Sequence, residues 1–469
     1  MSINTQFERK GNSMKITLKD FGPISHFEFD LEKDLHVIFG KNSVGKSYAI
    51  SVIYLVLKNL AKIEDSQFYQ FYHIYPEFSE QAIKRLEKDS QVYQQNSPEN
   101  NIDFIEIIQR EVATLLFSEF TRELEKSLKS SFPGIDQLRN CHSASEAFSI
   151  ILDFADFQLY IKSTAGEKLI SAIKIQTQFS VKQGLKQYSS LSLVNFSEQD
   201  ILKLSATIDS LLSSSLKEMN RYSNSIHFLP SSRSGLYQAL NTFSALLAEL
   251  SKSRNFLTSK IELPNISEPV SDYFLSLSNI SSLSNSPHHY EASDIEKNIL
   301  NGEVLFNEST KKLYYRQFGV ERDFELSFTS SMVSEISPIV GYLKYILREG
   351  NDNILFIEEP EAHLHPEVQV KLMEQFAALS GKRLQIVMTS HSNYMFNKLS
   401  NLILDNKMDH NKVASYLMRP TEAGSVADML SMKAEEDGMN DKNFADTAEM
   451  LYEERIEIYE RLNNAAKKC

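Results

Sequence analysis

The stretch LHVIFGKNSVGKSYAISVIYLVLKNLAK, residues 35 to 62, decides the fold. Its first six residues, with their β-branched and aromatic side chains, predict a short buried strand, and the run from residue 47 has the length and apolar density of a largely buried helix. Between them GKNSVGKS, residues 40 to 47, satisfies the pattern G-x-x-x-x-G-K-[ST]. Because this pattern between a strand and a helix is typical of phosphate binding, we expect an α/β fold built around the loop.

The residue types of this loop suit a nucleotide with its Mg²⁺ ion. Gly40 and Gly45 let the backbone curl so that successive N–H groups point inward, and the helix N-terminus adds partial positive charge. Lys46 can reach the β- and γ-phosphates, and the Ser47 hydroxyl can ligate Mg²⁺. A surface turn rich in glycine and lysine is the structural alternative. The residues predicted to bind the nucleotide are Gly40, Lys41, Asn42, Ser43, Val44, Gly45, Lys46 and Ser47.

A second apolar strand, NILFI at residues 353–357, ends in two carboxylates, Glu358 and Glu359. Beside the phosphates, one carboxylate can hold Mg²⁺ through water while the next orients or deprotonates the attacking water. Adjacent residues of a strand point to opposite faces, so we expect the two glutamates to differ in role. The alternative is an acidic pair that ends the strand only because loops are polar, and the upstream loop favours the functional interpretation.

Two histidines follow in the segment FIEEPEAHLHP, at His363 and His365. With Glu359 and Glu361 they look like metal ligands, but the segment has no H-E-x-x-H spacing and no cysteine nearby. Pro366 is well placed as the first residue of the next helix, which leaves both histidines in the connecting loop. We therefore expect Mg²⁺ delivered with the nucleotide rather than a dedicated transition-metal site.

A third histidine, His391, follows the buried strand LQIVMTS at residues 384–390. Ligands bind at the carboxyl ends of strands in an open α/β sheet, so His391 can contact a γ-phosphate or its attacking water. A purely structural histidine is the alternative. The helix PEVQVKLMEQFAAL lies between the two apolar strands, and this strand–helix–strand order predicts a parallel βαβ unit.

The remaining apolar patterns predict both strands and helices. Residues 15–30 predict a hairpin around a Gly-Pro turn, and residues 303–328 two or three short strands. SMVSEISPIVGYLKYILREG predicts a helix crossed by Pro338 near its start. Residues 272–293, rich in Ser, Asn and Pro, predict a surface loop.

Composition limits the class of protein. A chain of 469 residues with 42% apolar residues can bury a sizeable core. Its two cysteines, Cys141 and Cys469, support neither a disulfide framework nor a thiolate site, which fits a reducing cytoplasm. No apolar run reaches the roughly eighteen residues of a membrane span. A net charge of −13 argues against a uniformly basic coat for nucleic acid, although a local groove that binds DNA stays open.

Together these motifs resemble the ABC-type ATPase heads of the RecF, Rad50 and SMC group, and most closely the AAA15 or OLD-type (overcoming lysogenization defect) ATPases of antiphage systems such as PARIS and Septu. GKNSVGKS resembles their Walker A motif, ILFIEEPEAHLHP their Walker B motif, VMTSHS their switch-histidine strand, and FLPSSRSG their Pro and Arg motif. The resemblance covers roughly residues 14 to 60 and 226 to 420. It implies a P-loop NTPase fold of the ABC-head type, with a mixed sheet, flanking helices and an antiparallel β subdomain.

The resemblance also implies roles for the site residues and ATP with Mg²⁺ as cofactors. Lys46 and Ser47 bind phosphate and Mg²⁺. Glu358 stands at the position of the usual Walker B aspartate and ligates the metal. Glu359 is the catalytic carboxylate, and His391 is the γ-phosphate switch.

A partner protomer is a further implication of the resemblance. His365 falls near the D-loop acid of ABC ATPases, so the histidines of this segment face a dimer partner rather than a metal. In TSSMVSEIS, Ser330 and Ser331 stand where the ABC signature touches the γ-phosphate of the opposite protomer, but the signature's glycines are missing. Hydrolysis is therefore expected to be slow or differently organised. Arg233 is a candidate site residue without an assigned role.

Four regions are expected along the chain. Residues 14–60 form the first part of the head, 61–225 a mostly helical insertion with some strands, 226–420 the second part of the head, and 421–469 a helical C-terminal tail.

Three functions are compatible with these observations. The first is the ATPase subunit of an antiphage complex, which forms an ATP-sandwiched homodimer or higher oligomer and controls a separately encoded nuclease or toxin. The second is a DNA repair ATPase that clamps DNA directly, which the acidic chain supports only weakly. The third is a nucleotide-locked scaffold in which ATP binding, rather than turnover, carries the signal.

Overall fold

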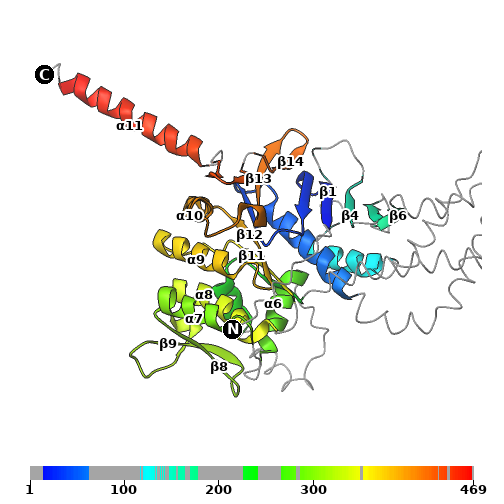
Figure 1. The fold of residues 1–469 in the computed structure, drawn as a ribbon, viewed down its shortest axis with the longest axis horizontal. Helices are drawn as coiled ribbons and strands as arrows, with labels where there is room; N and C mark the ends of the chain where they lie inside the picture. Colours follow the sequence, from blue (N-terminus) through cyan, green and yellow to red (C-terminus); the bar gives the residue numbers. More distant parts are fainter. Residues whose placement is uncertain are drawn as a thin grey trace, which may run out of the picture.

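A mixed sheet of eleven strands forms the centre of the protein, shown in a computed structural model (Figure 1). In the order in which they lie side by side, its strands are β6 (Ile170–Thr177), β5 (Phe157–Ser163), β4 (Ser149–Asp153), β1 (Lys15–Phe21), β2 (Ile24–Asp30), β14 (Gly424–Asp428), β13 (Val413–Thr421), β3 (Leu35–Gly40), β12 (Leu384–Ser390), β11 (Asn353–Glu358) and β7 (Ser225–Leu229). The residues that the structure describes are 14–62, 117, 120–132, 134, 138, 140, 142, 147–154, 157–163, 170–177, 225–240, 266–280, 286–348, 352–430, 432–440 and 444–466.

One half of the sheet is parallel, and it contains the three strands whose ends carry the predicted nucleotide-binding residues. Strands β13, β3, β12, β11 and β7 run in the same direction. Every residue of β3 and of β12 is buried. A parallel strand covered on both faces has no solvent side, which explains why these segments read as continuous apolar runs. The predicted strands at residues 35–40, 353–357 and 384–390 are confirmed, and so is the parallel βαβ unit.

The other half of the sheet is largely antiparallel. β1 and β2 form the predicted hairpin, in which Phe21 faces Ile24 across the turn. β1 also pairs with β4, and β4, β5 and β6 continue antiparallel beyond it. β14 connects the two halves, because it pairs antiparallel with β13 and parallel with β2. The predicted fold class, a mixed sheet with an antiparallel β subdomain and flanking helices, is confirmed.

Helices cover both faces of the sheet. A helix over residues 46–62, here called the P-loop helix, packs into one core cluster together with Ile38 of β3. The neighbouring β3 residues Val37 and Phe39 belong to the opposite cluster. That cluster also contains residues of α8 (Ser331–Gly341), α9 (Pro366–Leu379) and α10 (Asn393–Leu404). The parallel strands are therefore packed between these two core clusters, one on each face of the sheet.

Pro338 lies inside α8 and not near the start of its helix. The helix continues as a π-helical turn, η7 (Tyr342–Ile346), whose end is closed by the N–H of Leu347 donating to the carbonyl of Tyr342 at 3.0 Å. Proline has no N–H and clashes with the preceding turn, so a change of helical pitch follows it.

The prediction of a surface loop over residues 272–293 is wrong where the described residues of that range form helices. It contains most of α6 (Glu268–Ser278) and the beginning of α7 (His289–Ile295), which the π-turn η5 (Glu296–Leu300) extends. Tyr273 and Leu277, one helical turn apart, are both buried, and Pro269 lies in the first turn. Burial of this stripe outweighs the low helix propensity of the surrounding Ser and Asn residues.

The C-terminal region differs in part from the predicted helical tail of residues 421–469. β14 completes the sheet, and β15 (Ala434–Glu435) and β16 (Gly438–Met439) form a small separate ribbon. Among the described residues of this region, the helical segment is α11 (Ala445–Ala466), which projects away from the body (Figure 1). The short strands predicted over residues 303–328 are confirmed as β8 (Gly302–Asn307), β9 (Lys312–Gln317) and β10 (Phe324–Glu325).

Most of the predicted insertion at residues 61–225 lies outside the described residues. The described residues 120–131 are helical, and β4, β5 and β6 fall within the same range. The boundaries of the four predicted regions stay a prediction. Among the described helices, none has both the length and the apolar character required to cross a membrane.

Candidate nucleotide-binding site

The loop of residues 40–47 joins β3 to the P-loop helix, as predicted. Gly40 and Gly45 have φ angles of 147° and 91°, in the region that favours glycine. A Cβ atom at Gly40 would lie 2.7 Å from the carbonyl oxygen of Met418, and one at Gly45 would lie 2.9 Å from Cγ of Pro23. Strand β13 and the turn between β1 and β2 thus approach the loop so closely that only glycine fits at both positions.

The middle of the loop is open on one side and anchored on the other. Lys41, Asn42 and Ser43 are exposed, and Ser43 has a φ of 63°. Val44 is buried in the core cluster beneath the P-loop helix. This anchoring holds the loop curled while its outer backbone stays accessible to a ligand.

Lys46 is folded back onto its own loop. Its ammonium donates to the carbonyl of Gly40 at 3.0 Å and to that of Lys41 at 2.8 Å. Burial lowers the pKa of Lys46 to about 8, against the opposing effect of the carboxylates of Glu359 and Glu361. The lysine thus lies between the curled loop and the acidic strand ends, where a phosphate would raise its pKa by charge neutralisation.

Ser47 and Glu358 form the pair predicted to hold Mg²⁺. Burial raises the pKa of Glu358, and the hydrogen bond from the Ser47 side chain opposes that rise. Two neighbouring oxygen ligands of octahedral Mg²⁺ lie about 2.9 Å apart, since each lies about 2.0–2.1 Å from the metal. A hydroxyl and a carboxylate within hydrogen-bond range therefore already have the spacing that this ion needs, and the residues present fit it.

Glu359 and His391 meet at the ends of neighbouring strands. Nε2 of His391 lies 3.4 Å from Oε1 of Glu359, and the hydrogen bond from this imidazole is the main cause that lowers the pKa of Glu359. Glu359 has a φ of 42°, and its N–H donates to Oγ1 of Thr389 at 3.2 Å. A positive φ at a residue other than glycine is strained and persists only where its surroundings enforce it.

Glu361 was not singled out for a role in the site by sequence reasoning, yet it positions His391. Its Oε1 accepts from the Ser390 hydroxyl at 2.9 Å and from the His391 N–H at 2.5 Å. Burial raises its pKa. Its second oxygen, Oε2, is buried with no hydrogen-bond partner among the described residues. The position of Glu361, two residues after Glu359, was the sequence feature that could have pointed to it, although that feature suggested a metal ligand.

Arg233 is fully buried behind the two glutamates at the end of β11. Its guanidinium donates to the carbonyls of Glu358 at 2.8 Å, Glu359 at 3.3 Å and Pro230 at 3.1 Å. It also donates to the carbonyl of Glu335 at 3.2 Å, and it lies 3.4 Å from a carboxylate oxygen of the same residue. Arg233 therefore holds the backbone that carries both carboxylates.

Glu335 is the second residue that sequence reasoning missed. It is fully buried in α8, and its Oε1 accepts from the Ser234 hydroxyl at 2.6 Å. A single acid on the apolar face of a predicted helix was the signal that could have identified it. Through Arg233, it connects α8 to the end of β11.

Among the described residues, Ser330 and Ser331 make no hydrogen bond with the loop of residues 40–47. Ser330 caps α8, because its hydroxyl accepts from the Val333 N–H at 3.4 Å, and Ser331 is the first residue of the helix. Both are exposed.

His363 and His365 are also exposed, on either side of the buried Leu364. Nδ1 of His365 accepts from the N–H of Glu367 at 3.4 Å and caps α9, which begins at Pro366 as predicted. Among the described residues, no group of three or more His, Cys, Asp or Glu side chains is arranged to hold a metal ion.

Comparisons with solved structures identify SMC heads at low similarity. The SMC head domain from Thermotoga maritima has 9% identity and a TM-score of 0.38, over 89% of this chain and 98% of that chain. The Smc head domain with an extended coiled coil from Pyrococcus furiosus, bound to the C-terminal domain of ScpA, has 12% identity and a TM-score of 0.40, over 95% and 100%. No curated protein sequence matches the chain.

The sequence profile of one protein family does match. It is the family AAA_15, described as "AAA ATPase domain", and the match runs over residues 14–396. This range includes the glycine loop, both glutamates at the end of β11, and His391. On this match, which spans well over half of its length, the chain belongs to the AAA_15 family of AAA ATPase domains.

Proposed function

We propose that this chain binds ATP with Mg²⁺ and hydrolyses it at Glu359. The observation that carries the proposal is the meeting of three groups at one edge of the sheet. The curled glycine loop with Lys46 follows β3, the Ser47–Glu358 pair lies beside it, and the Glu359–His391 pair follows β11 and β12. Because β3, β12 and β11 are parallel neighbours, their carboxyl ends form one ligand site.

Each group has a distinct chemical task. The backbone N–H groups of the loop and Lys46 bind the phosphate oxygens and neutralise their charge. Mg²⁺ held by Ser47 and Glu358 would supply further charge neutralisation at the β- and γ-phosphates. Glu359, kept ionised by its lowered pKa, accepts a hydrogen bond from the attacking water and orients it. His391 donates from Nε2 to the Glu359 carboxylate and so fixes it beside the γ-phosphate.

The complete site is proposed to need a second protomer. Ser330 and Ser331, at the N-terminus of α8, are exposed and contact their own helix rather than the loop of their own chain. Phe328 beside them is 81% exposed, so a large apolar side chain lies next to this end of the helix. Both features support an interface in which this end of α8 lies against ATP bound to another copy.

The proposed dimer can be tested by its mass in solution. Glu359→Gln should slow hydrolysis and trap ATP, so light scattering should report a mass of twice the 53.7 kDa chain or more with ATP, and less without it. Adding Phe328→Glu should abolish this increase, whereas Phe318→Glu, at another exposed phenylalanine, should not. A trapped protein that stays monomeric with ATP bound would contradict the sandwiched dimer.

The biological role is proposed to be antiphage defence, as the ATPase subunit that controls a separately encoded nuclease or toxin. The resemblance of FIEEPEAHLHP and the other motifs to AAA15 and OLD-type defence ATPases supports this role, together with membership of the AAA_15 family. Cells that carry the gene with its native neighbours should plate phage less efficiently, and Lys46→Ala should restore plating. Equal plating with and without the wild-type genes, across a broad phage panel, would contradict the role.

A further inference from the structure

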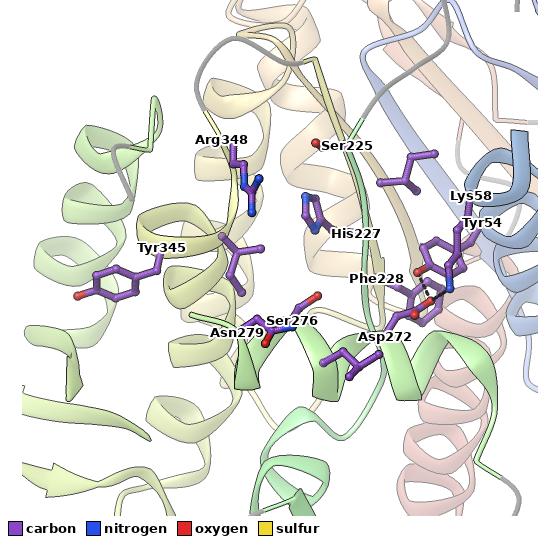
Figure 2. A pocket seen from close by; sticks show the side chains of 13 residues that line it. Tyr54, Lys58, Ser225, His227, Phe228, Asp272, Ser276, Asn279, Tyr345 and Arg348 are labelled. Carbon is purple, nitrogen blue, oxygen red and sulfur yellow. Dashed lines mark hydrogen bonds and ion pairs between the residues drawn. The ribbon is translucent and has the colours of Figure 1, made fainter. Parts of the chain in front are cut away.

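A second cavity, away from the nucleotide site, runs along the outer edge of β7 and has a volume of about 420 Å³ (Figure 2). Its walls come from the far end of the P-loop helix, from β7, from α6, and from η7 with the residues that follow it. Lys58 in its wall follows Lys46 by twelve residues, which is about 18 Å of helix. The volume falls within the range of roughly 300–1,000 Å³ typical of small-molecule sites.

Two polar side chains face each other across this cavity, and each has a nitrogen that makes no hydrogen bond among the described residues. Figure 2 shows the imidazole of His227 and the guanidinium of Arg348 pointing toward the same space. Nε2 of His227 is buried and has no hydrogen-bond partner among the described residues. Within the same part of the chain, the guanidinium of Arg348 makes no hydrogen bond or ion pair either. A buried polar nitrogen without a partner is costly, so a ligand that accepts from it is favoured.

Arg348 is the cation of this cavity that is available to a ligand. The other cation in its wall, Lys58, is already paired with Glu268 at 2.6 Å and with Asp272 at still shorter range. Asp272 also accepts from the Tyr54 hydroxyl at 2.6 Å. Among the described residues, the guanidinium of Arg348 is therefore the cation of this wall that no carboxylate pairs with, and its planar fork suits a carboxylate or a phosphate.

The rest of the lining is mixed and includes exposed apolar surface. Leu275 of α6 is 59% exposed, and Ile226 and Ile346 also line the cavity. Burial, reinforced by the charge of Arg348, lowers the pKa of His227 to about 4. Its imidazole is therefore neutral near pH 7 and can donate from Nε2 in the appropriate tautomer.

We propose that this cavity binds a small organic anion whose carboxylate or phosphate group is held by Arg348 and His227 and whose apolar part covers Leu275. Such an occupant touches three elements that also carry residues of the nucleotide site. The P-loop helix begins at Lys46, β7 leads to Arg233, and η7 continues the helix that contains Glu335. The proposal goes beyond the proposed ATPase function and does not depend on it.

The experiment is calorimetric titration of the full, nucleotide-free chain with phenyl phosphate and with benzoate. The neutral benzyl alcohol serves as the ligand control. We expect saturable binding of at least one anion and none of the alcohol. Arg348→Ala should weaken binding about tenfold or more, because a charged hydrogen-bonded contact is lost, and His227→Phe should weaken it several-fold. Arg455→Ala, at an exposed arginine of α11, should leave binding unchanged.

Two results would overturn the proposal. One is the absence of saturable binding to the wild type by either anion. The other is binding that survives Arg348→Ala but disappears in Lys46→Ala, because the anion would then occupy the glycine loop. Arg348→Lys, which keeps the charge but not the fork, should give an intermediate affinity. The ATPase account is unaffected by either outcome, since it rests on turnover rather than on these ligands.

Discussion

Nε2 of His391 lies 3.4 Å from a carboxylate oxygen of Glu359, at the ends of two parallel strands that are neighbours in the sheet. Each member of the pair is fixed by a third residue. The Glu359 N–H donates to Thr389, and the His391 N–H donates to Glu361. The proposed catalytic pair is therefore held directly after two strand ends, and this is a preorganised arrangement for orienting water.

Replacing His391 by alanine should slow turnover and shift its pH dependence. The hydrogen bond from His391 is the main cause of the lowered pKa of Glu359, so its loss should raise that pKa. The acid limb of the kcat/KM profile should then move to higher pH, with kcat about 10²-fold lower at neutral pH. Steady-state ATP hydrolysis measured across the pH range checks both effects. His391→Gln keeps a donor and should shift the acid limb less, and an unshifted limb in both variants would contradict the pairing.

Arg233 is expected to stabilise the fold and to position the site. Arg233→Met leaves the buried Glu335 without its partner and should lower the free energy of unfolding by about 3–5 kcal/mol. Arg233→Met combined with Glu335→Leu should lose less than the sum of the two single changes. Even a stably folded double variant should hydrolyse slowly, because the carbonyls of Glu358 and Glu359 lose their donors.

Denaturant unfolding and kcat, measured on the same variants, test this role. The control is Arg316→Met, which breaks an exposed pair with Asp323 and should change neither quantity. Additive losses of stability would show that Arg233 and Glu335 act independently. Full turnover in the folded double variant would show that Arg233 does not position the carboxylates.

ATP binding should take up protons on the alkaline side of neutrality. The pKa of Lys46 is about 8 without nucleotide, and the triphosphate should raise it. Between the two pKa values, at about pH 8.5, binding should take up roughly three quarters of a proton per ATP, and at about pH 6.5 almost none from this group. Calorimetry in buffers of different ionisation enthalpy measures the uptake. An uptake that persists unchanged in Lys46→Arg would assign the proton to another group.

Ser47 is expected to set the Mg²⁺ requirement. Ser47→Ala removes one ligand and the hydrogen bond to Glu358, so the Mg²⁺ concentration at half-maximal turnover should rise about tenfold. Ser309→Ala, at an exposed serine outside the loop, is the control and should leave this concentration unchanged. Equal Mg²⁺ dependence in all three proteins would exclude Ser47 as a ligand.

Much of the fold could be predicted because the central parallel strands consist almost entirely of buried residues. β3, β11 and β12 are buried almost throughout, so their apolar runs identify a parallel sheet without knowledge of long-range contacts. The region of α6 could not be predicted in the same way. Its helix depends on burying Tyr273 and Leu277 against elements distant in the sequence, while its Ser and Asn content favours a loop. The place of β14 likewise depends on pairing with β2, some four hundred residues away.

The candidate site could be predicted where a residue acts through its own local motif. Gly40, Gly45, Lys46 and the two glutamates at the end of β11 lie where their patterns indicated. Glu361 and Glu335 were missed because their roles depend on partners thirty or more residues away, at His391 and Arg233. Arg233 itself was noticed, but the carbonyls to which it donates are visible only once β7 and β11 lie side by side.

The measurement that tests the central claim most directly is ATP turnover by the full chain with Mg²⁺, compared with Glu359→Gln, with ATP binding determined on the same samples. The account predicts that the wild type hydrolyses ATP and that Glu359→Gln is about 10²-fold slower or more, while its affinity for ATP stays within about threefold. Turnover at the wild-type rate by Glu359→Gln, or no ATP binding by the wild type, would contradict it.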